Sequence, residues 1–197
     1  FPNSGDIYRL AHAHPYSYSD HKRHLAGLLE NERTSRYLNH AILCKTLGGN
    51  DCDLLTVTDP HDTPITATGI VSGRYGLSGM VGRRGMNKRC VVISARVHPG
   101  ETPASWMMRG MLDFLTGDSA EARLLRSLFV FKIVPMLNPD GVAFGNNRCS
   151  LAGVDLNRQW KRPSRALHPT VFWLKQYIRQ EQAKKGVGMY IDLHGHR

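Results

Sequence analysis

Two histidines and one glutamate stand at the ends of segments that are predicted to be buried strands. His98 and Glu101 belong to a His-Pro-Gly-Glu stretch that follows the β-branched run at 90–95, and His194 ends the apolar run from 187. Ligands of open α/β sheets bind beyond the carboxyl ends of the strands, so these three side chains should meet at one sheet edge. Catalytic zinc takes such nitrogen and oxygen ligands, usually three from the protein, and keeps a fourth position for water. The pattern is therefore compatible with one Zn²⁺ per chain, held by His98, Glu101 and His194.

Purely structural roles remain possible for two of these residues. A His-x-x-Glu spacing is weak by itself, and His98 also suits a capping or structural role. Glu101 suits the first turn of a helix, where the helix dipole favours a carboxylate. Seven other histidines are interpreted as surface or core residues and not as ligands: His12, His14, His21, His24, His40, His61 and His168.

A second group of polar residues falls in the long segment before the helix predicted at 168. Arg148, Asn157 and Arg158 together could form a receptor for a carboxylate, because guanidinium groups bind carboxylates in a bidentate manner. Asp155 could accept the proton from the second nitrogen of a ligand histidine. The alternative is that these are ordinary surface arginines and a turn asparagine.

Strands and helices must alternate to position these residues. Strands are predicted at 7–13, 41–47, 53–58, 90–95, 128–135 and 187–194, and helices at 19–31, 102–117 and 168–184. The last three strands read as continuous apolar runs, which is typical of strands buried on both faces. Thr102 is expected to cap the second helix, with Pro103 at its first position. This order predicts an α/β fold with a mainly parallel sheet covered by helices.

The composition fits one globular domain with a basic surface. The 197 residues are 41% hydrophobic, which excludes a wholly disordered chain. The net charge of +10 attracts polyanions or serves general solubility. We expect no membrane partner, since no apolar run approaches the ~20 residues of a membrane helix and no signal peptide opens the chain. We expect no nucleic-acid partner either, because no recognition motif is found.

Two further features are weaker signals. The glycines between 69 and 85 are mixed with basic residues, which favours a solvated basic loop over a phosphate cradle because no phosphate-binding motif is matched. The four cysteines form no CxxC pair, and we interpret them as reduced thiols of a cytosolic protein. A bridge between Cys44 and Cys52 is the alternative.

Several of these segments together have a familiar order. They are HPGE at 98–101, NPDGV at 138–142, GNNRCSLAGVDLNRQW at 145–160, DLHGH at 192–196, HPYSYSD at 14–20 and TLGGNDCDLLTVT at 46–58. The set resembles the zinc metallocarboxypeptidases, and in particular their cytosolic carboxypeptidase subfamily. The resemblance implies a mixed, mainly parallel sheet sandwiched between helices, with zinc bound by His98, Glu101 and His194.

The resemblance also implies roles for the second group. Asn157 and Arg158 match the residues that bind the terminal carboxylate of the substrate, and Arg148 matches the arginine that polarises the scissile carbonyl. Asp155 matches the aspartate behind the first histidine. Cytosolic members remove C-terminal or branched glutamates, notably from tubulin tails, and the basic charge is compatible with such a polyanionic substrate.

One departure from the family pattern concerns the end of the chain. The general-base glutamate of the family lies well downstream of the third zinc ligand, and the chain stops three residues after His194. Residues 1–197 are therefore interpreted as the N-terminal two-thirds of one catalytic domain, incomplete at its C-terminus. The chain alone would then hold metal and carboxylate but turn over very slowly.

The sequence thus predicts a cytoplasmic zinc carboxypeptidase that acts on acidic C-terminal tails. Three alternatives remain. One is a zinc amidohydrolase that acts on N-acyl amino acids, and another is a non-catalytic protein that binds acidic tails. The third is a nucleic-acid-binding protein.

Overall fold

The computed structural model describes residues 3–8, 10–11, 13–60, 88–184 and 186–195. The strands are β1 (Leu38–Lys45), β2 (Asp51–Val57), β3 (Arg89–Ala95), β4 (Phe129–Val134) and β5 (Val187–Leu193). The helices are α1 (Tyr18–Glu30), α2 (Glu32–Ser35), α3 (Thr102–Thr116), α4 (Ala120–Leu128), α5 (Pro139–Phe144) and α6 (Pro169–Lys184), with a 3₁₀ turn at Leu156–Arg158. Within these residues no helix has the length and apolar character needed to cross a membrane.

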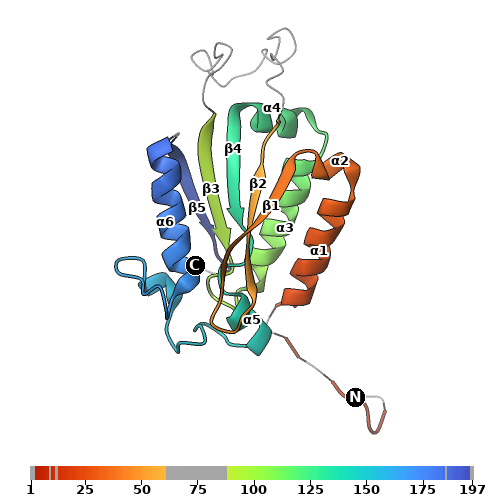
Figure 1. The fold of residues 1–197 in the computed structure, drawn as a ribbon. Helices are drawn as coiled ribbons and strands as arrows, with labels where there is room; N and C mark the ends of the chain where they lie inside the picture. Colours follow the sequence, from red (N-terminus) through yellow and green to blue (C-terminus); the bar gives the residue numbers. More distant parts are fainter. Residues whose placement is uncertain (1–2, 9, 12, 61–87, 185, 196–197) are drawn as a thin grey trace.

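The strands form one mixed sheet in the order β1-β2-β4-β3-β5. The pairs β1/β2 and β2/β4 are antiparallel, whereas β4/β3 and β3/β5 are parallel. The predicted α/β class is confirmed, with the parallel pairing confined to β3, β4 and β5. Figure 1 shows that these three strands run in one direction, toward the end of the molecule where α5 lies. Side chains that follow β3, β4 and β5 are therefore collected at this end.

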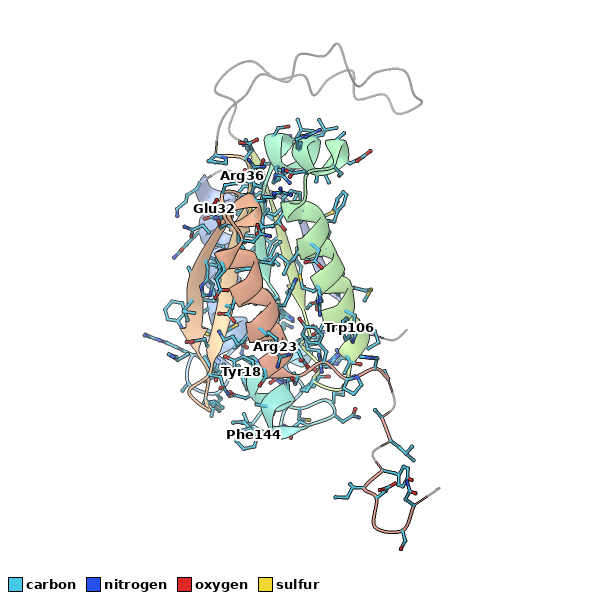
Figure 2. All side chains as sticks on the ribbon, turned by 90° about the vertical axis from the view of Figure 1, so that its right-hand side faces the viewer. Tyr18, Arg23, Glu32, Arg36, Trp106 and Phe144 are labelled. Atoms are coloured by element: carbon cyan, nitrogen blue, oxygen red, sulfur yellow. The ribbon has the colours of Figure 1, made fainter. Side chains whose placement is uncertain are left out.

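Helices cover both faces of the sheet and form two layers of core (Figure 1). On one face, α1 and α3 pack Leu25, Leu28, Met108 and Leu112 against residues such as Ile93. Tyr18 and Arg23 on α1 and Trp106 on α3 mark these two helices in Figure 2.

The opposite face is covered by α6. Val171 and Leu174 of this helix pack on Cys90 and Val92 of β3, and Leu156 of the 3₁₀ turn joins the same cluster. The parallel strands are thus held between two apolar layers, which fixes the positions of their carboxyl ends.

A buried carboxylate fastens α1 to the β1/β2 hairpin. Asp53 is 2% exposed, and its oxygens lie 2.8 Å from His21 Nε2, 2.8 Å from Lys22 Nζ and 2.8 Å from His40 Nε2. Burial alone would raise the pKa of Asp53, but the hydrogen bonds from His21, Lys22 and His40 outweigh it and hold the pKa well below its usual range. Two of the histidines not expected to be ligands thus have a structural partner, whereas His12 and His61 lie outside the described residues.

The caps of two helices differ from the predictions. Helix α1 begins at Tyr18, one residue before the predicted range 19–31, because Ser17 and Asp20 form a reciprocal capping box. Helix α3 has Glu101 at its N-cap in place of the predicted Thr102, and Pro103 is its second residue. The Glu101 side chain makes no capping hydrogen bond to α3. The Glu101 carboxylate contacts His98 and His194 instead, so it is not available to cap the helix.

Two strand predictions were wrong in part. The described residues of 7–13 form no strand, and Ile7 and Leu10 are 82% and 96% exposed, because no neighbouring strand pairs with them. The segment 187–194 does form a strand, but it is not buried on both faces. Among the described strands β5 lies at an edge of the sheet, and its Met189 is 57% exposed.

Helical structure was also missed. Helices α2 and α4 and the short α5 were not predicted, and α5 with the 3₁₀ turn lies in the long segment before the helix predicted at 168. The glycine-rich stretch at 69–85 lies outside the described residues.

Candidate metal centre

The loop between β3 and α3 presents the first two candidate ligands. Strand β3 ends at Ala95, and Arg96 then takes a left-handed backbone conformation with φ of +57° that turns the chain. The buried Arg96 side chain donates from Nε to the Pro99 carbonyl (2.8 Å) and from Nη1 to Ser105 Oγ (2.8 Å). Burial lowers the pKa of Arg96 to about 10, so the group is still a cation at neutral pH. Arg96 thus holds the loop in place through these two hydrogen bonds, a role that sequence reasoning missed.

The three predicted ligands converge on one point. His98 Nδ1 lies 2.7 Å from Glu101 Oε1, and His194 Nδ1 lies 2.9 Å from Glu101 Oε2. One ligand atom of each residue can be chosen so that all three lie within 4.8 Å of one another. His98 and Glu101 are 3% and 7% exposed, and the Gly195 N–H donates to Glu101 Oε2 at 3.0 Å. Within the described residues, this is the one His/Cys/Asp/Glu group with metal-binding geometry.

Each imidazole also meets a second carboxylate on its far side. His98 Nε2 lies 3.0 Å from Asp155 Oδ1, and His194 Nε2 lies 2.9 Å from Asp192 Oδ2. Asp192 is held in turn by Ser94, whose hydroxyl donates to Asp192 Oδ1 at 2.6 Å. Carboxylates of this kind fix the tautomer of metal-binding histidines. The contact of Asp155 agrees with the sequence prediction, whereas Asp192 was missed.

The donor set fits a divalent cation. A neutral imidazole carries one proton, so it donates to only one of its two carboxylate neighbours. With the protons on Nε2 facing Asp155 and Asp192, the Nδ1 lone pairs of His98 and His194 face the oxygens of Glu101. Facing lone pairs repel each other unless a cation lies between them, and nitrogen and carboxylate donors are those that zinc prefers.

The electrostatics keep both loop carboxylates ionised. Burial would raise the pKa of Glu101, but the Gly195 N–H and the two histidines outweigh it and lower the pKa. Burial likewise opposes ionisation of Asp155, and the hydrogen bonds from His98, the Asn157 N–H and Arg148 lower its pKa overall. At neutral pH the centre therefore offers negative charge to a metal.

Asp155 also accepts hydrogen bonds from two residues of the predicted carboxylate receptor. Arg148 Nε donates to Asp155 Oδ2 at 2.8 Å, and the backbone N–H of Asn157 donates to Asp155 Oδ1 at 2.8 Å. The Asn157 side-chain oxygen accepts from Trp160 Nε1 at 2.9 Å. Arg158 ends the same 3₁₀ turn, and its side chain is exposed. Arg148 and Asn157 are therefore brought to the centre through one carboxylate, and Arg158 follows directly in the chain.

Two glycines let the surrounding loops pack closely. A Cβ on Gly100 would lie 2.3 Å from the Asn147 side chain, and a Cβ on Gly141 would lie 2.3 Å from Pro99. The Gly100 N–H donates to the Asn147 carbonyl at 2.6 Å. The loops at 98–101 and 138–148 thus touch at positions where only glycine fits.

The neighbouring Asp140 ties this loop region to the hairpin turn between β1 and β2. Its carboxylate accepts from Thr46 Oγ1 (2.5 Å), the Gly48 N–H (2.8 Å) and Asn50 Nδ2 (2.8 Å). The turn that follows β1 is therefore held against the start of α5, directly beside the loops of the metal centre.

Comparison with known proteins shows which family the chain belongs to. The sequence profile of the family described as "Peptidase_M14: Zinc carboxypeptidase" matches residues 30–196. The chain is 42% identical over 196 residues to cytosolic carboxypeptidase 2 of Xenopus tropicalis and 43% identical over 198 residues to cytosolic carboxypeptidase 1 of Xenopus laevis. All of the chain is covered, but only 18% and 15% of these relatives. The chain thus spans less than a fifth of their length.

Solved structures of carboxypeptidases have a similar fold. A putative carboxypeptidase A from Shewanella denitrificans superposes with a TM-score of 0.71 and 28% identity, covering 92% of this chain and 40% of that one. A metallo-carboxypeptidase from Burkholderia cenocepacia gives a TM-score of 0.70 and 30% identity, covering 92% of this chain and 42% of that one. The family match over most of the sequence, the shared fold and the convergent histidines and glutamate lead to one conclusion: the chain belongs to the zinc carboxypeptidase family.

Proposed function

We propose that the protein containing this chain is a zinc-dependent metallocarboxypeptidase that removes C-terminal residues from peptides. The observation that carries the proposal is the convergence of His98, Glu101 and His194, with both outer imidazole nitrogens occupied by carboxylates. We assign one Zn²⁺ per chain to these three residues. A zinc ion in such a site polarises a carbonyl group and lowers the pKa of bound water.

The residues around the centre divide the remaining work. Asp155 and Asp192 hold the protons of His98 and His194 on Nε2, which keeps the Nδ1 lone pairs available. Arg148 uses its Nε for Asp155, so its terminal N–H groups remain for the scissile carbonyl, where a fixed positive charge stabilises developing negative charge. The general base is assigned to a glutamate downstream of His194, as the family resemblance implies.

Asn157 and Arg158 are proposed to bind the terminal carboxylate of the substrate. The Asn157 side-chain oxygen is occupied by Trp160, so its NH₂ group remains to donate. The exposed Arg158 guanidinium supplies charge and a fork of donors that match a carboxylate. This arrangement would restrict cleavage to the last residue of a chain, and it favours a peptidase over an N-acyl amino acid amidohydrolase.

The substrate is proposed to be an acidic C-terminal tail that ends in glutamate, such as that of tubulin. Between Asp155 and Glu181 the sequence has six basic residues and no acidic one: Arg158, Lys161, Arg162, Arg165, Lys175 and Arg179. This segment begins at the candidate carboxylate receptor and adds to the overall charge of +10, which attracts polyanions. The names of the relatives, cytosolic carboxypeptidases, support a cytoplasmic location.

The test measures metal content and hydrolysis in the intact protein. His98→Ala should abolish zinc binding and cleavage of a peptide ending in glutamate, whereas the matched variant His14→Ala, at an exposed position, should keep both. Unchanged zinc content in His98→Ala would refute the ligand set.

A substrate panel separates the alternatives. We expect cleavage of the free-carboxylate peptide and no cleavage of its amidated form or of an N-acyl amino acid. Cleavage of the N-acyl amino acid alone would favour the amidohydrolase, and tight binding of acidic peptides without turnover would favour the non-catalytic binder. Glutamate preference should weaken as salt rises, because long-range attraction is screened; a preference independent of salt would remove the charge argument.

A further inference from the structure

A pair of cysteines joins the two strands of the β1/β2 hairpin. Cys44 of β1 and Cys52 of β2 are directly opposed in the antiparallel register, next to an irregularity of β1 between Ile42 and Cys44. Both are free thiols, and the buried Cys52 S–H donates to the Met136 carbonyl at 3.7 Å. Strand β1 is the edge opposite to β5, so the pair is separate from the strands that carry the metal ligands.

The two thiols differ in access and in acidity. Cys44 is half-buried and lines an open hollow of about 460 Å³ together with Lys45, Arg165 and Trp173. Cys52 is fully buried. The neighbouring Cys52 thiol lowers the pKa of Cys44, whereas the neighbouring Cys44 thiol and burial raise the pKa of Cys52. The more accessible sulfur is therefore the better nucleophile, since reactivity follows thiolate character and exposure.

We propose that Cys44 and Cys52 form a reversible oxidation site that a peroxide converts to a cross-strand disulfide. The Cys44 thiolate attacks one oxygen of hydrogen peroxide, the O–O bond breaks, and the second oxygen leaves as hydroxide and becomes water. Cys44 is then a sulfenic acid. The Cys52 sulfur attacks the Cys44 sulfur, the S–O bond breaks, and hydroxide leaves with the Cys52 proton as a second water. The two sulfurs lose two electrons in total, and the peroxide oxygens gain them.

The geometry of the hairpin makes this disulfide easy to reduce again. Directly opposed residues of an antiparallel pair have Cβ atoms about 4.5–5.5 Å apart, whereas a disulfide requires about 3.5–4.5 Å. The bridge must therefore draw β1 toward β2, at a point where β1 is already irregular. Strained disulfides of this kind are more oxidising and are reduced by thiols more readily than structural ones. The site is thus suited to cycling between two states.

Peptide mapping of the intact wild-type protein provides the first test. Lys45 separates the two cysteines, so trypsin places Cys44 in the peptide 37–45 and Cys52 in a peptide that begins at Thr46. Treatment with stoichiometric hydrogen peroxide and then an alkylating agent should yield these two peptides linked, and dithiothreitol should separate them. Oxidation of Cys44 to the sulfinic acid without any linked peptide would overturn the proposal.

Variants test which sulfur attacks. Cys52→Ser should accumulate a Cys44 sulfenic acid that dimedone traps, and Cys44→Ser should lose both the link and the label in this hairpin. Cys149→Ser, at a half-buried cysteine outside the hairpin, is the matched control and should leave the linked peptides unchanged. If Cys52 in the Cys44→Ser variant reacted with peroxide and dimedone as fast as Cys44 does in the Cys52→Ser variant, Cys44 would not be the attacking thiol.

Discussion

Asp155 lies between His98 and Arg148 and makes contact with both. One carboxylate oxygen is 3.0 Å from His98 Nε2, and the other accepts from Arg148 Nε at 2.8 Å. The candidate metal ligand and the candidate carbonyl-binding arginine are therefore oriented by the same side chain. Two proposed functions, metal binding and polarisation of the substrate, should be perturbed together when this carboxylate is changed.

We expect Asp155→Asn to weaken zinc binding by about 10- to 100-fold, the usual effect of removing a carboxylate behind a ligand histidine. The amide no longer stabilises the Nε2 proton of His98 as an anion does. Competition with a chelator measures the affinity without relying on turnover. Asp118→Asn, on an exposed carboxylate paired with Arg36, is the control. Equal zinc affinity in both variants would exclude the orienting role of Asp155.

Asp192→Asn should have a similar effect through the second histidine. The Asp192 carboxylate contacts His194 Nε2 at 2.9 Å and is itself held by Ser94. Ser94→Ala should give a smaller loss of zinc affinity, because it only loosens Asp192. The same competition assay applies, and a larger loss in Ser94→Ala than in Asp192→Asn would contradict this order of effects.

Arg158→Ala should raise KM for peptides with a free C-terminal carboxylate. The expected loss in kcat/KM is about 10- to 100-fold, which corresponds to one hydrogen bond with a charged group. Arg23→Ala removes an arginine whose side chain is 75% exposed on α1 and serves as the control. Steady-state kinetics on paired free and amidated peptides measure the effect. An equal change on both peptides would argue against carboxylate binding by Arg158.

Asp53→Asn should destabilise the fold by about 1–3 kcal/mol, because it leaves the buried hydrogen-bond donors around it imperfectly paired. The folded-state pKa of Asp53 is depressed, so its stabilisation is present above the ordinary carboxyl pKa near 4 and is lost as the pH falls through the folded-state pKa. Urea unfolding from pH 7 downward measures the free energy. The gap between wild type and variant should narrow in acid, and a gap that widens would reverse the assigned sign.

The location of the site was predictable from the sequence because parallel strands end together. His98, Glu101 and His194 follow or end predicted strands, and the structure places all three at the edge where β3, β4 and β5 end. Asp192 was missed because the run at 187–194 was interpreted as a strand buried on both faces. In any strand side chains two residues apart point to the same face, so the spacing of Asp192 and His194 is the signal that could have revealed their contact.

Other errors came from contacts between distant segments. Thr102 is a good N-cap by residue type, but α3 has Glu101 at its N-cap. The Glu101 carboxylate contacts His98 and His194 instead of capping the helix. The bracing of the loop by Arg96 depends on a left-handed residue and on Ser105, which no local pattern indicates. Residues 7–13 have strand propensity, but the described residues of that stretch lie where no strand pairs with them.

The attachment of the hairpin turn to Asp140 limits where the chain tolerates extra residues. The turn at 46–50 lies partly exposed at the end of a hairpin, a type of position that usually accepts insertions and tags. Its three hydrogen bonds to Asp140 transmit any displacement to Gly141, which has no clearance from Pro99 beside His98. Epitope insertion or loop grafting at this turn would therefore disturb the candidate metal centre, although the grafted residues themselves lie on another strand pair.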